Sequence, residues 1–161
     1  MITINPIRPD LADWQGLLAL IMDSFAYMDG VIDPPSSAHR LTPETLAQKA
    51  RDEIAFLAHD GEMLVGCIFL KPEPHDCLYV GKLAVSPQAQ GRGIGRRLLQ
   101  LAQAEAARLG LKELRLETRI ELVANHASFS AWGFEKIAEK AHPGFQRPTF
   151  IEMRKRLVPA A

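Results

Sequence analysis

The chain has 161 residues, of which 47% are hydrophobic and 24% charged, a mixture that suits one folded domain over residues 1–161 and excludes global disorder. Lysine plus arginine and aspartate plus glutamate number 19 each, so no net charge favours nucleic acid or an anionic membrane as a partner. Two cysteines are too few for a secreted disulfide scaffold, and neither has zinc-ligand spacing. We therefore expect two partly buried thiols and no metal site.

The N-terminus lacks a basic segment followed by an apolar run, so the sequence predicts no signal peptide. No apolar stretch reaches about 18 residues, the length that a membrane-spanning helix needs. A soluble cytoplasmic protein is therefore expected.

The first fifty residues predict one strand and two helices. Alternating residues over Ile2–Ile7 indicate a strand, and Asp10 is placed to cap a helix whose apolar positions recur at helical spacing as far as Phe25. Residues 30–40 have the composition of a loop. Thr42, followed by a proline and a glutamate, is typical of a helix start, and that helix is expected to end near residue 53.

The remainder predicts strands that alternate with helices. Two strands joined by a turn at Asp60-Gly61 come first, and the later helices end at Gly110 and Gly133. The expected strands cover 54–58, 63–70, 78–85, 114–118, 134–138 and 149–156, and the expected helices cover 96–109 and 125–132. The order β-α-α-β-β-β-α-β-α-β-β, with hairpins first and a βαβ unit later, predicts an α/β domain with helices on the faces of a mixed sheet.

The most informative segment is Gln90–Arg96, where a strand leads through a loop into the glycines that open a helix. Glycines let backbone N–H groups approach a phosphate closely, and the first N–H groups of a helix lack intrahelical partners. The helix dipole adds a preference for negative charge, so this segment predicts an anion site that Arg92, Arg96 and Arg97 would reinforce. A turn that only starts a helix would carry three glycines at about 1 kcal/mol each with no offsetting gain.

Two other kinds of phosphate-binding loop fit this segment less well. A Rossmann loop would match the glycines only weakly, although Glu117 lies near the position of a ribose-binding acid. Five residues separate the strand from Gly91, and hairpins rather than βαβ repeats come before it, both of which argue against that fold. A Walker A loop is excluded because no Gly-Lys-Ser/Thr follows.

The segment Gln90-Gly91-Arg92-Gly93-Ile94-Gly95 resembles the Gln/Arg-x-x-Gly-x-Gly/Ala signature of the GNAT acyltransferases, and Asn125–Phe134 resembles their Asn-x-x-Phe-Tyr-x-x-x-Gly-Phe helix. The resemblance is specific from about residue 78 to 134. It implies the GNAT acyl-CoA N-acyltransferase fold, with a mixed, mostly antiparallel sheet flanked by helices, and acetyl-CoA as the acyl donor. It is also compatible with a homodimer.

The resemblance assigns the acetyl-CoA site residue by residue. The strand Leu83-Ala84-Val85 would pair with the pantetheine arm, and a backbone N–H near Leu83 would polarise the thioester carbonyl. Asn125 and Phe129 would flank the thiol. The implied cofactor-binding residues are Leu83, Ala84, Val85, Gln90, Gly91, Arg92, Gly93, Ile94, Gly95, Arg96, Asn125 and Phe129.

The catalytic residues are less well defined by the sequence. Phe129 stands where the family often has a tyrosine that protonates the leaving thiolate, so another group does this or the thiolate leaves unaided. Because an amine must be neutral to attack a thioester, a base is needed, and Glu117 at a strand end is the candidate, with His126 as an alternative. Tyr79 could line the acceptor pocket.

The loop after the first helix would shape that acceptor pocket. Its polar residues are Asp29, Asp33, Ser36, Ser37 and His39, and acids there would suit a cationic amine. The predicted function is direct transfer of an acetyl group from acetyl-CoA to a small-molecule or protein amine. A non-catalytic CoA-binding module and a nucleotide-binding oxidoreductase remain as alternatives.

Overall fold

The computed structural model describes residues 1–11 and 13–157, whereas residue 12 and residues 158–161 of the predicted domain lie outside the described residues. The order of α-helices and strands is the predicted one. The helices are α1 (Trp14–Phe25), α2 (Pro43–Asp52), α3 (Ile94–Arg108) and α4 (Val123–Ala131). The strands are β1 (Ile2–Pro6), β2 (Ile54–Asp60), β3 (Met63–Glu73), β4 (Cys77–Val85), β5 (Glu113–Arg119), β6 (Glu135–Lys140) and β7 (Phe150–Arg156).

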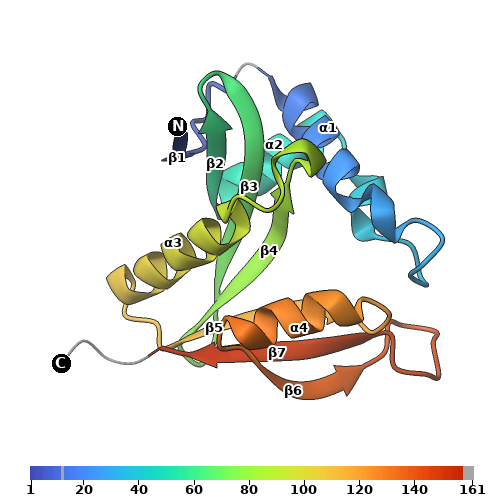
Figure 1. Ribbon diagram of the computed structural model, residues 1–161. Coiled ribbons are helices and arrows are strands. Elements are labelled where there is room, and N and C mark those ends of the chain that lie inside the picture. Colours follow the sequence, from blue (N-terminus) through green and yellow to red (C-terminus); the bar gives the residue numbers. More distant parts are fainter. Residues whose placement is uncertain (12, 158–161) are drawn as a thin grey trace.

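The strands form one sheet in the order β1-β2-β3-β4-β5-β7-β6. Neighbouring strands are antiparallel except β4 and β5, which are parallel and connected by α3. A parallel pair needs such a crossover, because its strands start at the same edge of the sheet. The predicted mixed, mostly antiparallel sheet flanked by helices is therefore confirmed (Figure 1).

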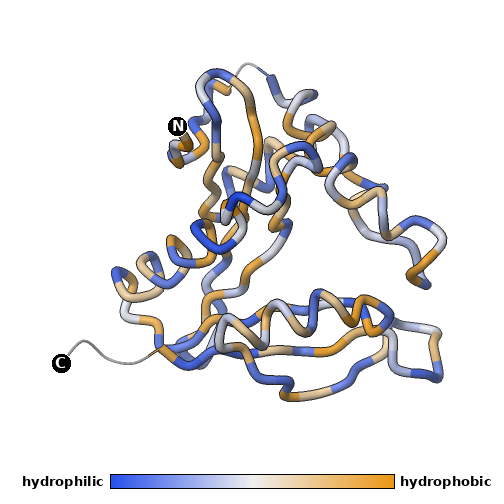
Figure 2. The backbone as a smooth tube through the Cα atoms, viewed as in Figure 1, coloured by the Kyte–Doolittle hydropathy of each residue, from blue (hydrophilic) through white to orange (hydrophobic). Residues whose placement is uncertain are grey.

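Two hydrophobic clusters fix the helices to opposite faces of the sheet. On one face, Leu98 and Ala102 of α3 are fully buried against strand residues such as Ile68. On the other face, Leu17 of α1 and Leu46 of α2 are fully buried in a second cluster. Figure 2 shows hydrophobic residues running along the strands between these helices. The helices whose apolar residues recur at helical spacing in the sequence thus cover both faces of the sheet.

The start of α2 follows the prediction, and the start of α1 does not. The Thr42 side chain accepts the N–H of Thr45 at 3.1 Å, as expected for a helix cap. The predicted cap Asp10 is wrong, since α1 begins only at Trp14. The Asp13 carboxylate accepts the N–H of Gly16 at 2.8 Å, and only an acid directly before the helix can reach that group.

The sheet opens between β4 and β5, and this opening positions the site. The two strands pair only where Cys77–Tyr79 faces Glu113–Arg115, although β5 continues to pair with β7 as far as Arg119. The β3–β4 register shifts near Lys82, whose φ of 47° lies in the left-handed region. Beyond Tyr79 the strands diverge (Figure 1), so one edge of β4 lacks a neighbouring strand.

The close approach of α3 to the sheet gives a stability prediction. A Cβ added at Gly66 of β3 would lie 3.1 Å from the Ala84 carbonyl oxygen and 3.3 Å from side-chain atoms of Ile94 and Leu98. Gly66→Val is therefore expected to lower the free energy of unfolding by about 1–3 kcal/mol, measured by urea denaturation. Met63→Val on the same strand, at an exposed position, serves as the control and should change it by less than about 0.5 kcal/mol.

Candidate active site

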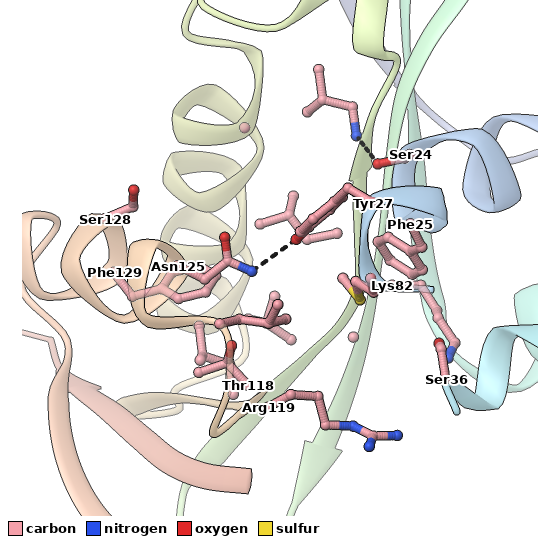
Figure 3. Close-up of a pocket in the computed structure, with 18 of the residues that line it drawn as sticks. Ser24, Phe25, Tyr27, Ser36, Lys82, Thr118, Arg119, Asn125, Ser128 and Phe129 are labelled. Carbon is pink, nitrogen blue, oxygen red and sulfur yellow. Dashed lines mark hydrogen bonds between the residues drawn. The ribbon is translucent and has the colours of Figure 1, made fainter. Parts of the chain in front are cut away.

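A cavity of about 970 Å³ lies at the opening between β4 and β5. Its walls come from α1 and the turn after it, residues 36–37, β4, the glycine loop, β5 and α4 (Figure 3). Most of the site residues predicted from the sequence line it, namely Leu83, Val85, Gln90, Gly91, Gly93, Ile94, Gly95, Arg96, Glu117, Asn125 and Phe129. The structure thus brings the glycine loop, the strand edge and the candidate base together around one cavity.

The glycine loop has the geometry of an anion site. Gly91 and Gly93 have φ values of 82° and 76°, which an L side chain rarely adopts. Gly93 is the residue before α3 and no side chain caps the helix there, so the first-turn N–H groups remain available to a ligand. Arg96 lies in the same wall of the cavity. This end of the cavity suits a phosphate group.

Ala84 and Arg92, which the sequence also assigned to cofactor binding, do not line the cavity. The Arg92 guanidinium instead donates to the Asp60 carboxylate at 2.8 Å, and it holds the pKa of that carboxyl below its usual range. Arg97 donates to the backbone carbonyl of Ile2 at 3.4 Å. Of the three arginines near the loop, only Arg96 therefore reaches the cavity.

The open edge of β4 presents backbone N–H groups to the cavity. The Ser86 N–H points to β3, where it donates to the Val65 carbonyl at 2.8 Å. The Val85 N–H points the opposite way and donates to the Ser24 hydroxyl of α1 at 3.1 Å (Figure 3). Leu83 lies two residues earlier on β4 and also lines the cavity. Ala84, between them, packs into the core instead.

Glu117 is held by an arginine that three carboxylates share. Arg115 donates to Glu117 at 2.7 Å, to Glu73 at 2.9 Å and to Glu152 at 3.2 Å. Its guanidinium also lies 4.6 Å from the centre of the Tyr79 ring. Burial, followed by the nearby Glu117 charge, raises the pKa of Tyr79 to about 12, so this phenol stays protonated near neutral pH. Only Glu117 and Tyr79 of this group line the cavity.

The acids expected in the acceptor pocket lie outside it. Asp29 pairs with His39 at 2.9 Å, and Asp33 pairs with Arg147 at 3.0 Å. Only residues 36–37 of that loop line the cavity. The alternative base His126 is also absent from the lining, and its Nε2 lies 2.8 Å from the backbone carbonyl oxygen of Arg119.

Several cavity residues were missed by sequence reasoning, among them Tyr27, Ser24 and Lys82. Tyr27, in the turn after α1 (Ala26–Met28), accepts a hydrogen bond from the Asn125 amide of α4 at 2.9 Å, which spans the cavity (Figure 3). Ser24 holds the Val85 N–H, and Lys82 donates to Ser37 at 2.7 Å. All three contacts join elements far apart in the chain, so no local pattern could have revealed them.

Phe129 packs among aromatic residues. Its ring centre lies 6.0 Å from that of Trp132 and 5.8 Å from that of Phe134, both edge to face. Asn125, one helical turn earlier, faces the cavity beside it. At the thiol end predicted for acetyl-CoA, α4 therefore presents one aromatic ring and one amide.

The cysteines lie apart from the cavity lining. Cys67 and Cys77 are buried, as expected, and burial raises the pKa of Cys67 to about 12 and also raises that of Cys77. Within residues 1–11 and 13–157, no three His, Cys, Asp or Glu side chains are grouped to hold a metal ion. Over the same ranges, no helix has the length and apolar character for crossing a membrane.

A mixed sheet that opens beside a glycine-started helix defines an acyl-CoA N-acyltransferase fold, and solved proteins share it. The PaiA N-acetyltransferase of Thermoplasma acidophilum, solved with coenzyme A, superimposes with a TM-score of 0.78 over 98% of this chain and 99% of that one, at 20% identity. A GNAT family acetyltransferase of Elizabethkingia anophelis with acetyl-CoA bound gives a TM-score of 0.70 over 97% and 98%, at 19% identity.

The sequence comparisons agree with the structural ones. The chain belongs to the Acetyltransferase (GNAT) family, whose profile matches residues 14–134. A mycothiol acetyltransferase of Jonesia denitrificans is 29% identical over 86% of this chain and 44% of its own length. The chain spans a quarter to about half the length of the first curated relatives it matches.

Proposed function

We propose that this chain transfers an acetyl group directly from acetyl-CoA to a small-molecule or protein amine. The observation that carries the proposal is a single cavity with three features in its walls. These are the N-terminus of α3, which suits a phosphate group, the open edge of β4 and the Glu117 carboxylate. Gln90 to Arg96 would hold the pyrophosphate, and the pantetheine arm would lie along the β4 edge. Family members solved with coenzyme A or acetyl-CoA support this choice of donor.

The backbone of β4 would activate the thioester. The N–H of Leu83, which lines the cavity on β4, would donate to the thioester carbonyl, which becomes more negative as the amine attacks. A fixed N–H stabilises that charge without reorganising during the reaction. Holding the donor and acceptor side by side would supply a further part of the rate.

Glu117 would remove the proton from the acceptor amine. It lines the cavity with about a third of its side chain exposed, so an amine or a bridging water can reach the carboxylate. The hydrogen bond from Arg115 fixes its position. Its neighbours Glu73 and Glu152 share the same arginine but do not line the cavity, which makes Glu117 the member available for proton transfer.

Tyr27 is the candidate for protonating the leaving thiolate. Its hydroxyl oxygen accepts a hydrogen bond from Asn125, so its proton remains available to another acceptor. Asn125 is one helical turn from Phe129, so Tyr27 brings a phenol from the opposite wall close to where the family often has one. Phe129 would exclude water from the same end of the cavity.

Phe129 is also the observation that favours the second candidate function, a non-catalytic CoA-binding module. Such a module would bind acetyl-CoA and release no thiol with any amine. The third candidate, a nucleotide-binding oxidoreductase, would bind NAD. Titration with acetyl-CoA, CoA and NAD, followed by a thiol-release assay with an amine panel, separates all three.

The donor site is tested at Gly95. A Cβ there meets only Val85 at 3.7 Å, so a side chain fits without a ligand, whereas Gly91 and Gly93 would also be strained by their positive φ. Gly95→Leu is expected to weaken acetyl-CoA binding at least about tenfold in isothermal titration, because its side chain occupies the approach to the helix N-terminus. Gly95→Ala is the matched control and should keep most of the affinity. Unchanged affinity in folded Gly95→Leu would remove the pyrophosphate from this loop.

The base is tested with two glutamates that bind the same arginine. Glu117→Gln should lower kcat/KM by about 10²–10⁴-fold and move the acidic limb of the pH profile, with the acetyl-CoA Kd unchanged. Glu73→Gln also removes a carboxylate from Arg115, but outside the cavity, and should have a much smaller effect on kcat/KM. Equal losses in the two variants would mean that Glu117 only supports the ion-pair cluster.

The proposed proton donor to the leaving thiolate is tested by moving the phenol from position 27 to position 129. Tyr27→Phe should lower kcat by about tenfold or more, most clearly below the pKa of a free thiol, because the thiolate then leaves without a proton donor. The double variant Tyr27→Phe/Phe129→Tyr, which returns a phenol from α4, is expected to recover part of that loss. Phe129→Leu controls for packing and should be mildly damaging. A kcat in Tyr27→Phe equal to that of the parent would exclude Tyr27 as the donor.

A further inference from the structure

Two cations from different strands face the same loop in the cavity. Lys82 comes from β4 and Arg119 from β5, and both line the cavity and reach the loop 34–37 (Figure 3). Arg119 is two residues after Glu117, so both side chains lie on one face of β5, about 7 Å apart along the strand. Lys82 and Arg119, here called the cationic pair, therefore lie at the acceptor end, near the candidate base.

Lys82 is partly buried with a neutral partner. Its ammonium donates to the Ser37 hydroxyl at 2.7 Å, and among the described residues no carboxylate forms an ion pair with it. Burial, together with the positive charges of Lys49 and Arg40, lowers its pKa to about 8. Burying a cation without a counter-charge is unfavourable. An anion in the cavity would remove that penalty.

Arg119 also forms no ion pair with a carboxylate among the described residues. It donates to the backbone carbonyls of Pro34 and Pro35 at 2.5 and 3.1 Å, and burial lowers its pKa. The charges of Glu121 and Asp33 oppose that lowering from a distance, but both carboxylates form their ion pairs with Arg147 instead. A guanidinium has five N–H donors, so Arg119 can bind a further acceptor while it holds the loop.

Arg115 lies on the same strand as Arg119 but is surrounded by carboxylates. The lack of ion-paired carboxylates is therefore confined to the part of β5 near Arg119. Three carboxylates share Arg115, and its hydrogen bonds to Glu73 and Glu117 raise its pKa. A role in holding the loop 34–37 in place would explain the hydrogen bonds of the cationic pair. It would not explain why these donors are positively charged and lack ion pairs among the described residues. Neutral donors would bind a hydroxyl and carbonyls equally well without the desolvation penalty.

Building on the proposed function, we propose that the amine acceptor carries an anionic group, a carboxylate, that the cationic pair binds with Ser37. The amine would lie near Glu117 and the carboxylate near Arg119. Because these two residues are only about 7 Å apart along the strand, one small molecule such as an α-amino acid or a short ω-amino acid would carry both groups. Charge-assisted hydrogen bonds from an ammonium and a guanidinium suit a carboxylate. The absence of Asp29 and Asp33 from the cavity lining removes the sequence-based case for a cationic acceptor.

The test compares acceptors that differ only in charge. Each of several amino acids is assayed with its amide and with the amine that lacks the carboxyl group, and kcat/KM from thiol release is expressed per neutral amine. The carboxylate form should exceed its amide by about 10- to 100-fold. Lys82→Met should reduce that ratio to near one. Lys112→Met, which removes an exposed lysine at the far end of β5, should keep the parent ratio.

Binding of the N-acetylated amino acid, which has a carboxylate and no amine to titrate, gives an independent measurement. Its affinity should weaken as pH rises through about 8, because Lys82 loses its proton there. The other charged groups that act on Lys82 are Lys49, Arg40, Glu53 and Arg119. Lys82→Arg should bind without that pH dependence. Circular dichroism confirms that each variant is folded.

The outcomes separate this proposal from the proposed function. Neutral or carboxyl-free amines used as well as the amino acids would overturn it, and so would an unchanged ratio in folded Lys82→Met. If acetyl-CoA binds but no amine releases thiol, the proposed function fails. The cationic pair is then judged by carboxylate binding alone, where binding to the parent and not to Lys82→Met supports the proposal, and no binding to the parent overturns it.

Discussion

The unpaired edge of β4 is the constraint on which the site depends. Backbone N–H groups must be satisfied, and a strand that loses its neighbour needs other partners. β4 loses β5 after three residue pairs, and the left-handed conformation at Lys82 turns the strand as it leaves the ladder. The Ser24 hydroxyl satisfies the Val85 N–H from α1. The rest of the edge faces a cavity of ligand size, so the break in the sheet creates a binding surface.

The same break distributes charge unequally along β5. Arg115 lies where the strands still pair, and carboxylates from β3, β5 and β7 surround it. Arg119 lies beyond the break, where no neighbouring strand supplies a carboxylate, and it holds backbone carbonyls instead. One strand therefore carries an arginine paired with three carboxylates at its closed end and, at its open end, an arginine without an ion pair among the described residues, with Glu117 between them. This order places the carboxylate that we propose as the base beside a positive charge on one wall of the cavity.

The sequence predicted the order of elements, the glycine loop and the Thr42 cap, because apolar periodicity, glycines and capping residues act over a few neighbours. It did not reveal contacts between residues that lie far apart in the chain. Asp60, thirty-two residues before Arg92, draws that arginine from the phosphate end, and Arg147 draws Asp33 from the acceptor end. Tyr27 has no local signature either, since its partner Asn125 is ninety-eight residues away.

The hydrogen bond between Tyr27 and Asn125 would have to open for the proposed donor, acetyl-CoA, to enter the cavity. It joins the turn after α1 to α4 across the opening of the sheet, and about half of Tyr27 is exposed. One hydrogen bond contributes only about 0.5–1.5 kcal/mol, so separating the two walls is inexpensive. On the other side, Phe129 is fixed between Trp132 and Phe134. Aromatic neighbours thus hold the ring at position 129, whereas the wall at Tyr27 is lightly held. In the proposed mechanism, a phenol on the lightly held wall would adjust its distance to the departing sulfur after the donor has entered, which a phenol packed at position 129 would not do.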